Sequence, residues 1–155
     1  MNDTDFVRVP ARAVTSLMTD SLIAAGLPSA DAARCAELMT QADLTGADGH
    51  GVLRLPQYVR RLKAKGFNAH PSITVTRTAP ATALVDGDNG MGHLVMTRAA
   101  DEAIAMARDT GVSWVGVRCS NHAGPDGTPI ASGLVPSNKS VPPQVAMWLA
   151  LATAA

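Results

Sequence analysis

The spacing of apolar residues changes at Pro71, and this change constrains the fold more than any other feature of the chain. Before Pro71, apolar residues recur every three or four positions, which is typical of helices with one buried face. After Pro71, residues 72–78 alternate and are rich in β-branched side chains, which favours a strand. The sequence therefore predicts an α/β protein, in which an N-terminal helical segment is followed by a mixed sheet with helices.

Three helices are predicted before Pro71. The first covers residues 11–25, where Gly26 ends the apolar pattern, and the second runs from an N-cap at Ser29 to about Leu44. The third covers about residues 51–65, and its basic residues before Gly66 suit a helix C-terminus.

Strands and one further helix are predicted after Pro71. Residues 72–78 and 82–86 form a hairpin pattern, residues 87–92 a glycine-rich loop, residues 96–111 a helix and residues 112–117 an apolar strand. Residues 126–144 are rich in Pro, Gly and Ser without a period, so no element is expected there. The apolar run at residues 145–155 is expected to have no partner element.

Charge and cysteine content restrict the partners and the compartment. Thirteen basic and thirteen acidic residues leave no net charge, so neither a nucleic acid nor a membrane surface is expected as partner. The N-terminus does not resemble a signal peptide, and residues 145–155 are too few to span a bilayer, so the cytoplasm is expected. Cys35 and Cys119 are far apart and are predicted to be buried free thiols in a reducing compartment.

The first candidate site consists of His50, Arg54 and Tyr58. Positions four apart project along nearly the same side of a helix, so the three side chains are predicted to form a stripe. Pro56 requires the helix to begin shortly before it, which would place His50 at the helix N-terminus, where anions bind. An arginine fork beside it would suit a small carboxylate. Alternatively, the three residues are a capping histidine, a solvated arginine and a packing tyrosine.

The second candidate is His122, in the segment CSNHAG at residues 119–124. This segment follows an apolar strand, and α/β proteins often place ligand-binding groups after the ends of buried strands. Imidazole titrates near neutrality and can exchange a proton with a substrate, so His122 is a candidate general acid or base. The alternative is an ordinary turn residue.

Two weaker patterns lead to no site assignment. GDNGMGH, at residues 87–93, matches neither the dinucleotide-binding nor the phosphate-loop pattern and is predicted to be a turn before a helix. Asp48, His50, His93 and His122 would hold a metal only if the fold gathered them. Their spacing matches no recognised ligand pattern, so no metal is expected.

Three blocks together resemble the malate/L-lactate dehydrogenase family of non-Rossmann NAD(P)-dependent oxidoreductases, which includes ureidoglycolate dehydrogenases and piperideine-2-carboxylate reductases. They are QADLTGADGHGVLRLPQYVRRL, TALVDGDNGMGHLV and GVSWVGVRCSNHAGP, in this order. The resemblance covers roughly residues 10–125. It implies NAD or NADP as cofactor, a cytoplasmic enzyme, and a homodimer or an association with a full-length relative.

The resemblance also implies roles for the candidate residues. His50 and Arg54 would contact the substrate carboxylate and the oxygen or nitrogen beside it, and Tyr58 would line the same pocket. His122 would be the acid/base that exchanges a proton while the nicotinamide takes or gives hydride. The implied reaction is the reversible reduction of a 2-oxo acid or a cyclic imino acid. Residues that bind the cofactor stay unassigned.

The chain also departs from the family pattern. Gly49 stands where serine is usual and Ala123 where an aromatic residue is common, and the match stops at about Asp126. Family members continue with a catalytic lysine and most of the nicotinamide domain, and Lys139 lies in unrelated surroundings. We therefore expect a truncated member or a frameshifted tail, divided into a helical substrate-contact segment (residues 1–70), the start of the nicotinamide domain (71–125) and a non-family tail (126–155).

Two alternatives to an active enzyme stay open. The chain could be a non-catalytic interaction module that associates with a full-length relative, since the absent half would leave apolar faces exposed. It could also be a gene remnant that folds poorly.

Overall fold

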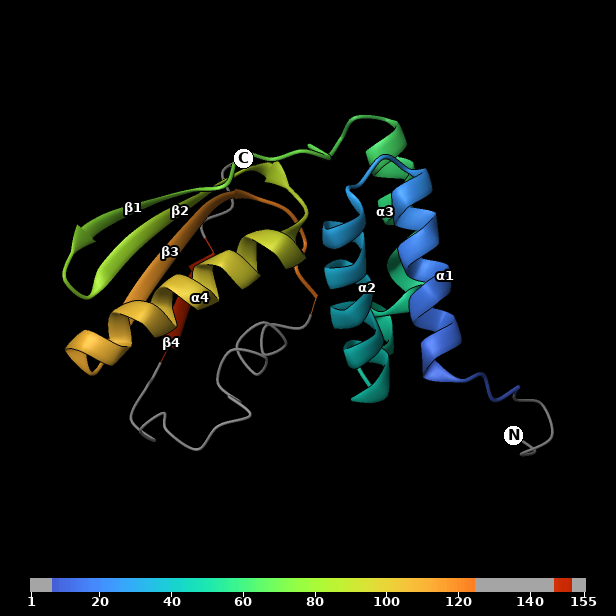
Figure 1. The fold of residues 1–155 in the computed structure, drawn as a ribbon, viewed down its shortest axis with the longest axis horizontal. Helices are drawn as coiled ribbons and strands as arrows, with labels where there is room; N and C mark the ends of the chain where they lie inside the picture. Colours follow the sequence, from blue (N-terminus) through green and yellow to red (C-terminus); the bar gives the residue numbers. More distant parts are fainter. Residues whose placement is uncertain (1–6, 125–146, 152–155) are drawn as a thin grey trace.

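Three α-helices precede the sheet, as the apolar spacing predicts. The computed structural model describes residues 7–124 and 147–151. Its first two helices are α1 (Ala11–Ala24) and α2 (Ser29–Leu44), which confirms both predicted helices, and α3 (Leu55–Lys63) follows (Figure 1). The prediction of a Ser29 N-cap is wrong, because Ser29 already lies inside α2 and no side chain caps the helix after Pro28. The three helices pack around a core formed by Met18, Leu22, Cys35, Met39, Leu55, Tyr58, Leu62 and Phe67, among others.

The segment before α3 differs from the prediction. The α-helix begins at Leu55 and not near residue 51, because two short 3-10 turns precede it, η1 (Asp48–His50) and η2 (Val52–Arg54). A carboxylate oxygen of Asp43 accepts a hydrogen bond from the backbone N–H of Val52 at 2.9 Å, between the two turns. Pro56 lies in the first turn of α3, where a missing N–H breaks no helical hydrogen bond.

The sheet is mixed, with strand order β1-β2-β3-β4. Strands β1 (Thr74–Ala79) and β2 (Thr82–Gly90) form the predicted antiparallel hairpin, and β3 (Ser113–Ser120) runs parallel to β2. Helix α4 (Gly92–Thr110) connects β2 to β3 and covers one face of the sheet (Figure 1). Its contact with β2 and β3 forms a second core, made by Ala83, Val85, Val95, Met96, Ala99, Ala103, Met106, Val115 and Val117.

Two predictions about the sheet are wrong. The glycine-rich segment is not a loop throughout, because β2 extends to Gly90 and α4 begins at Gly92, four residues before the predicted start. The apolar run near the end does have a partner element in part, since β4 (Met147–Leu151) pairs in parallel with β3. The rest of the predicted tail, residues 125–146 and 152–155, lies outside the described residues.

A bulge at the end of β2 holds the connection between α3 and β1. The register of β2 against β3 shifts between Asp86 and Gly90, and Asp88 and Asn89 both have positive φ there. Asp and Asn tolerate this conformation better than most residues. The side-chain amide of Asn68 donates to Asp88, and the backbone N–H of Asn68 donates to the carbonyl of Asn89, both at 2.9 Å. The bulge therefore links the sheet to the helical segment.

The cysteines do not share one environment. Cys35 is buried in the helical core, and burial raises the pKa of its thiol to about 12, which matches an inert free thiol. Cys119 is exposed, with φ of 51°, so the prediction that both thiols are buried is wrong for this residue.

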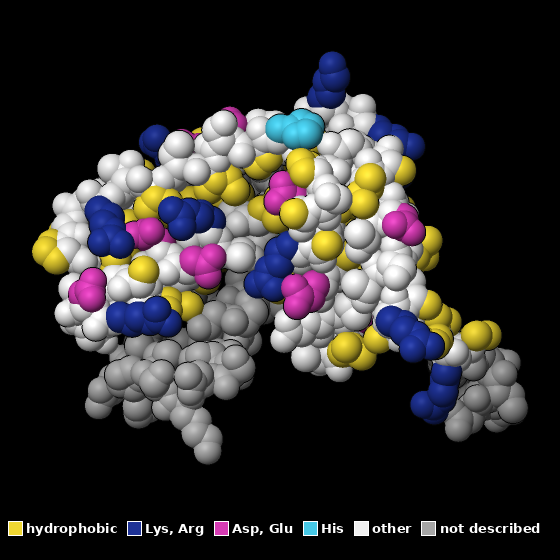
Figure 2. Space-filling model, viewed as in Figure 1, with side chains coloured by type: hydrophobic (Ala, Val, Ile, Leu, Met, Phe, Trp, Pro, Cys, Tyr) yellow, Lys and Arg dark blue, Asp and Glu magenta, His cyan; other side chains and the backbone are white. Residues whose placement is uncertain are grey.

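Basic and acidic side chains are interspersed over the face of the described residues drawn in Figure 2, without a large patch of one sign. No helix in the described part of the chain is both long enough and apolar enough to cross a membrane.

Candidate active site

His122 lies two residues beyond the carboxyl end of β3, and two of the predicted site residues contact it. The hydroxyl oxygen of Tyr58 is 2.6 Å from Nδ1 of His122, and Nδ1 of His50 is 3.1 Å from Nε2 of the same ring. The two imidazole rings are nearly parallel, at 7°, with centroids 5.0 Å apart. The fold therefore joins three of the four candidate residues into one hydrogen-bonded chain.

The three residues of the first candidate site do not form a helical stripe. His50 ends η1 and Arg54 ends η2, while only Tyr58 lies within α3. The predicted geometry is therefore wrong for His50, because the two 3-10 turns interrupt the helical spacing. His50 and Tyr58 come together because both lie against the loop that follows β3.

Arg54 lies beside this chain of contacts but is not part of it. Its Nε donates to the carbonyl of Gly49 at 2.7 Å, and Nη1 donates to Oε1 of Gln57 at 2.9 Å. A guanidinium has five N–H donors, so donors remain for a ligand carboxylate. Arg54 lines a cavity of about 430 Å³, together with Gly49, Leu53, Pro56, Gln57 and Arg60.

Asn121 holds the loop that carries His122. Its amide nitrogen donates to the backbone carbonyls of Asn89 and Gly90, at 3.1 and 2.9 Å, and to Oδ1 of Asn89 at 2.9 Å. Its own Oδ1 accepts a hydrogen bond from Arg61 of α3 at 3.3 Å. The loop is therefore tied to both β2 and α3. Only the position of Asn121 beside His122 could have indicated this role from sequence.

His93 is a buried residue beneath the same loop. Its side chain is 1% exposed, and neither ring nitrogen has a hydrogen-bond partner among the described residues. The ring packs edge-on against Tyr58, with centroids 5.6 Å apart. Burial, then the charges of His122 and His50, lower the pKa of His93 to about 4. The ring is therefore neutral at neutral pH.

His93 should make the protein less stable in mild acid. The unfolded chain binds a proton on this ring below its ordinary pKa of 6.5, whereas the folded protein binds it only near pH 4, so falling pH favours unfolding in this window. Between pH 7 and pH 5, wild type should lose about 2 kcal/mol more unfolding free energy than a His93→Leu variant. Urea unfolding at both pH values measures the difference, and equal losses in the two proteins would contradict the prediction.

The candidate metal ligands do not form a metal site. Within the described ranges, no group of three or more His, Cys, Asp or Glu residues is arranged to hold a metal ion. His50 and His122 contact each other instead, and His93 packs against Tyr58.

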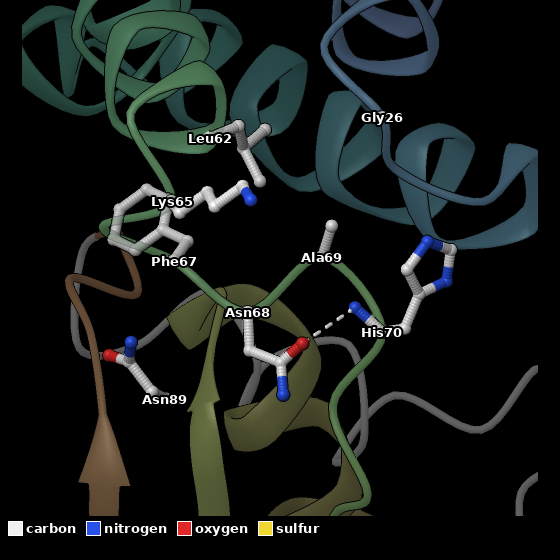
Figure 3. Close-up of a pocket in the computed structure, with 8 residues that line it drawn as sticks. All are labelled: Gly26, Leu62, Lys65, Phe67, Asn68, Ala69, His70 and Asn89. Carbon is white, nitrogen blue, oxygen red and sulfur yellow. Dashed lines mark hydrogen bonds between the residues drawn. The ribbon is translucent and has the colours of Figure 1, made fainter.

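A second cavity, of about 500 Å³, lies where α3 leads into the connection to β1 (Figure 3). Oδ1 of Asn68 accepts a hydrogen bond from the backbone N–H of His70 at 3.0 Å on its wall. None of the four candidate residues lines it, so we do not include it in the candidate active site. Its lining residues are Gly26, Leu62, Lys65, Phe67, Asn68, Ala69, His70 and Asn89.

Comparison with known proteins gives a family match for residues 9–132, to malate/L-lactate dehydrogenase. The malate dehydrogenase of Pyrococcus horikoshii is 42% identical over 122 residues, which are 79% of this chain and 34% of that protein. The solved structure of that enzyme superposes with a TM-score of 0.80, at 39% identity, over 85% of this chain and 38% of the other.

Two further relatives carry the names of other dehydrogenases. The L-sulfolactate dehydrogenase of Methanocaldococcus jannaschii is 41% identical over 70% of this chain and 31% of its own. The ureidoglycolate dehydrogenase (NAD(+)) of Escherichia coli K12 is 30% identical over 76% of this chain and 34% of its own. The chain thus spans about a third of the length of these curated relatives.

Proposed function

The chain belongs to the malate/L-lactate dehydrogenase family, and from this premise we propose that it carries the substrate-binding and proton-transfer groups for reversible reduction of a 2-oxo acid or cyclic imino acid. NADH or NADPH would supply the hydride. The observation that supports the proposal most directly is the contact of His122 with both Tyr58 and His50 at the carboxyl end of β3. A histidine held in this way is suited to exchange a proton with a reacting oxygen.

In this proposal Arg54 and His122 act on different parts of the substrate. Arg54 binds the carboxylate through its remaining guanidinium donors; its Nε is held by the carbonyl of Gly49, the residue before His50, and His50 contacts His122. In the direction of reduction, His122 donates a proton to the substrate oxygen as hydride arrives at the neighbouring carbon. Fixing these groups before the reaction lowers the barrier by proximity.

The N-terminus of α4 does not fit the phosphates of a dinucleotide cofactor. A phosphate needs free backbone N–H groups there. A Cβ at Gly92 would instead lie 2.1 Å from the carbonyl oxygen of Asn121 and 2.5 Å from that of His122, so the space is already filled. We therefore assign no cofactor-binding role to this turn.

The experiment that tests the proposal has two measurements on the 155-residue chain. Steady-state assays with NADH and with NADPH, over a panel of 2-oxo acids and cyclic imino acids, should show turnover of at least one substrate. Titration of the labelled chain with L-malate, followed by NMR, should perturb His50 and His122. The absence of both turnover and perturbation would contradict the proposal.

A second candidate function is association with a full-length relative without catalysis. It is favoured by apolar side chains that stay exposed next to η1 and η2, where Leu44 and Leu53 are each 72% exposed. Size-exclusion chromatography of the chain, alone and mixed with a full-length family member, would detect a mixed complex. Cooperative unfolding without turnover would favour this function over the enzymatic one.

Replacing Arg54 should mainly weaken substrate binding. Loss of hydrogen bonds between charged groups costs about 1.5–3 kcal/mol, so Arg54→Ala should raise KM or Kd for the carboxylate substrate about 10- to 100-fold, with a smaller change in kcat. Arg60→Ala is the matched control, because Arg60 lines the same cavity but is not a candidate residue. Equal effects of the two variants would show that only the general charge of the cavity matters.

A further inference from the structure

Tyr58 is too deeply buried to be part of an open substrate pocket. Only 2% of its surface is exposed, and its ring packs against Phe67 and His93. The family resemblance implies that this tyrosine lines the pocket. In the structure, however, its hydroxyl reaches Nδ1 of His122 at 2.6 Å. Any effect of this hydroxyl on a substrate must therefore pass through His122.

The hydroxyl proton of Tyr58 has one acceptor among the described residues, Nδ1 of His122. Burial raises the pKa of Tyr58 to about 12, so the hydroxyl keeps its proton at neutral pH. A buried donor without an acceptor is costly. The hydroxyl therefore donates to Nδ1, and this nitrogen must carry a lone pair.

A second contact agrees with this assignment. The backbone N–H of Gly124 also points to Nδ1 of His122, at 3.4 Å. A backbone N–H can only donate. The two donors together favour a neutral His122 with its proton on Nε2, the nitrogen that faces Nδ1 of His50.

We propose that Tyr58 is a positioning residue that fixes His122 as the Nε2–H tautomer, ready to donate that proton to a substrate oxygen. The opposite tautomer would leave the buried hydroxyl of Tyr58 without an acceptor, which corresponds to a preference of about 5- to 150-fold. With His122 in this tautomer, the proton on Nε2 faces Nδ1 of His50, 3.1 Å away. A substrate oxygen that takes the place of this nitrogen receives the proton while Nδ1 takes the hydroxyl proton of Tyr58, so the imidazole ring stays neutral. Water then returns a proton to Tyr58 through the exposed ring of His122. The inference deepens the proposed function and rests on it for its kinetic consequence, but the tautomer itself does not depend on catalysis.

The direct test is long-range ¹H–¹⁵N NMR of the ¹⁵N-labelled 155-residue chain, which distinguishes protonated from unprotonated imidazole nitrogens. A His122→Gln variant assigns the signals of His122. Wild type should show His122 as the Nε2–H tautomer, and Tyr58→Phe, which keeps the ring and loses only the hydroxyl, should show a several-fold larger share of the Nδ1–H tautomer. A Nδ1–H tautomer in wild type, or an unchanged tautomer in Tyr58→Phe, would overturn the inference.

A matched control removes another buried hydroxyl. Ser113 is 3% exposed and donates to the carbonyl of Ala103 at 2.7 Å, in the second core. Ser113→Ala should leave the tautomer of His122 as in wild type, and a change in this variant equal to that in Tyr58→Phe would also overturn the inference.

Kinetics supply the second measurement. If the chain catalyses the proposed reaction, Tyr58→Phe should lower kcat about 5-fold or more and leave KM nearly unchanged, because the hydroxyl does not touch substrate. A raised KM with unchanged kcat would return Tyr58 to the role of a substrate-binding residue. Because the NMR result does not need turnover, failure of this inference can be distinguished from failure of the proposed function.

Discussion

His122→Ala is expected to lower kcat by about 10²- to 10⁴-fold, the contribution typical of a positioned general acid or base. KM should change little, because the substrate carboxylate is assigned to Arg54. The side chain of His122 is exposed, so its removal leaves no buried cavity and should not unfold the protein. Steady-state kinetics with the substrate found in the panel assay measure the effect.

A second histidine and an added base make this prediction specific. His70 is also exposed and lies on the wall of the other cavity, so His70→Ala should keep wild-type kcat. Imidazole added to the buffer should restore part of the activity of His122→Ala, because it can exchange the proton that the side chain no longer carries. Similar losses in both histidine variants, without rescue, would show that His122 is not the acid/base.

The sequence predicts the bounds of a helix well where the spacing of its apolar residues determines them. The predicted end of the first helix differs by one residue from the end of α1, because Gly26 follows directly. The predicted start of the third helix differs by about four residues, since η1 and η2 precede α3 and the backbone N–H of Val52 between them donates to Asp43 of α2. Such a contact joins parts of the chain in space, and residue spacing does not reveal it.

For the candidate site, too, the sequence predicts the residues but not the contacts between them. His50, Tyr58 and His122 can be chosen by residue type and by the family resemblance, but their common hydrogen-bonded chain depends on how η1 and α3 lie against the loop after β3. The buried position of His93 has no local sequence signal. The three contacts made by the amide of Asn121 are indicated only by its place beside His122.

For Gly92→Ala, helix propensity and tertiary packing predict opposite changes in the stability of the protein. Gly92 is the first residue of α4, and replacing a helical glycine by alanine usually stabilises a protein by up to about 1 kcal/mol. At this position a Cβ would lie 2.1 Å from the carbonyl oxygen of Asn121 and 2.5 Å from that of His122. Both are backbone atoms, so no side-chain rotation relieves the overlap.

We therefore expect Gly92→Ala to lower the free energy of unfolding by about 3 kcal/mol in urea titrations. Gly49→Ala is the matched control, because no heavy atom of the described residues, apart from its chain neighbours, lies within 4 Å of a Cβ there. It should change stability by less than about 1 kcal/mol. The overlap should shift the loop after β3, which carries His122. A displacement of about 1 Å can lower a reaction rate about 10²-fold, so kcat should fall together with stability. A stabilised Gly92→Ala protein would mean that the loop after β3 can move away from α4, and that the contacts of His122 with Tyr58 and His50 do not depend on this close approach.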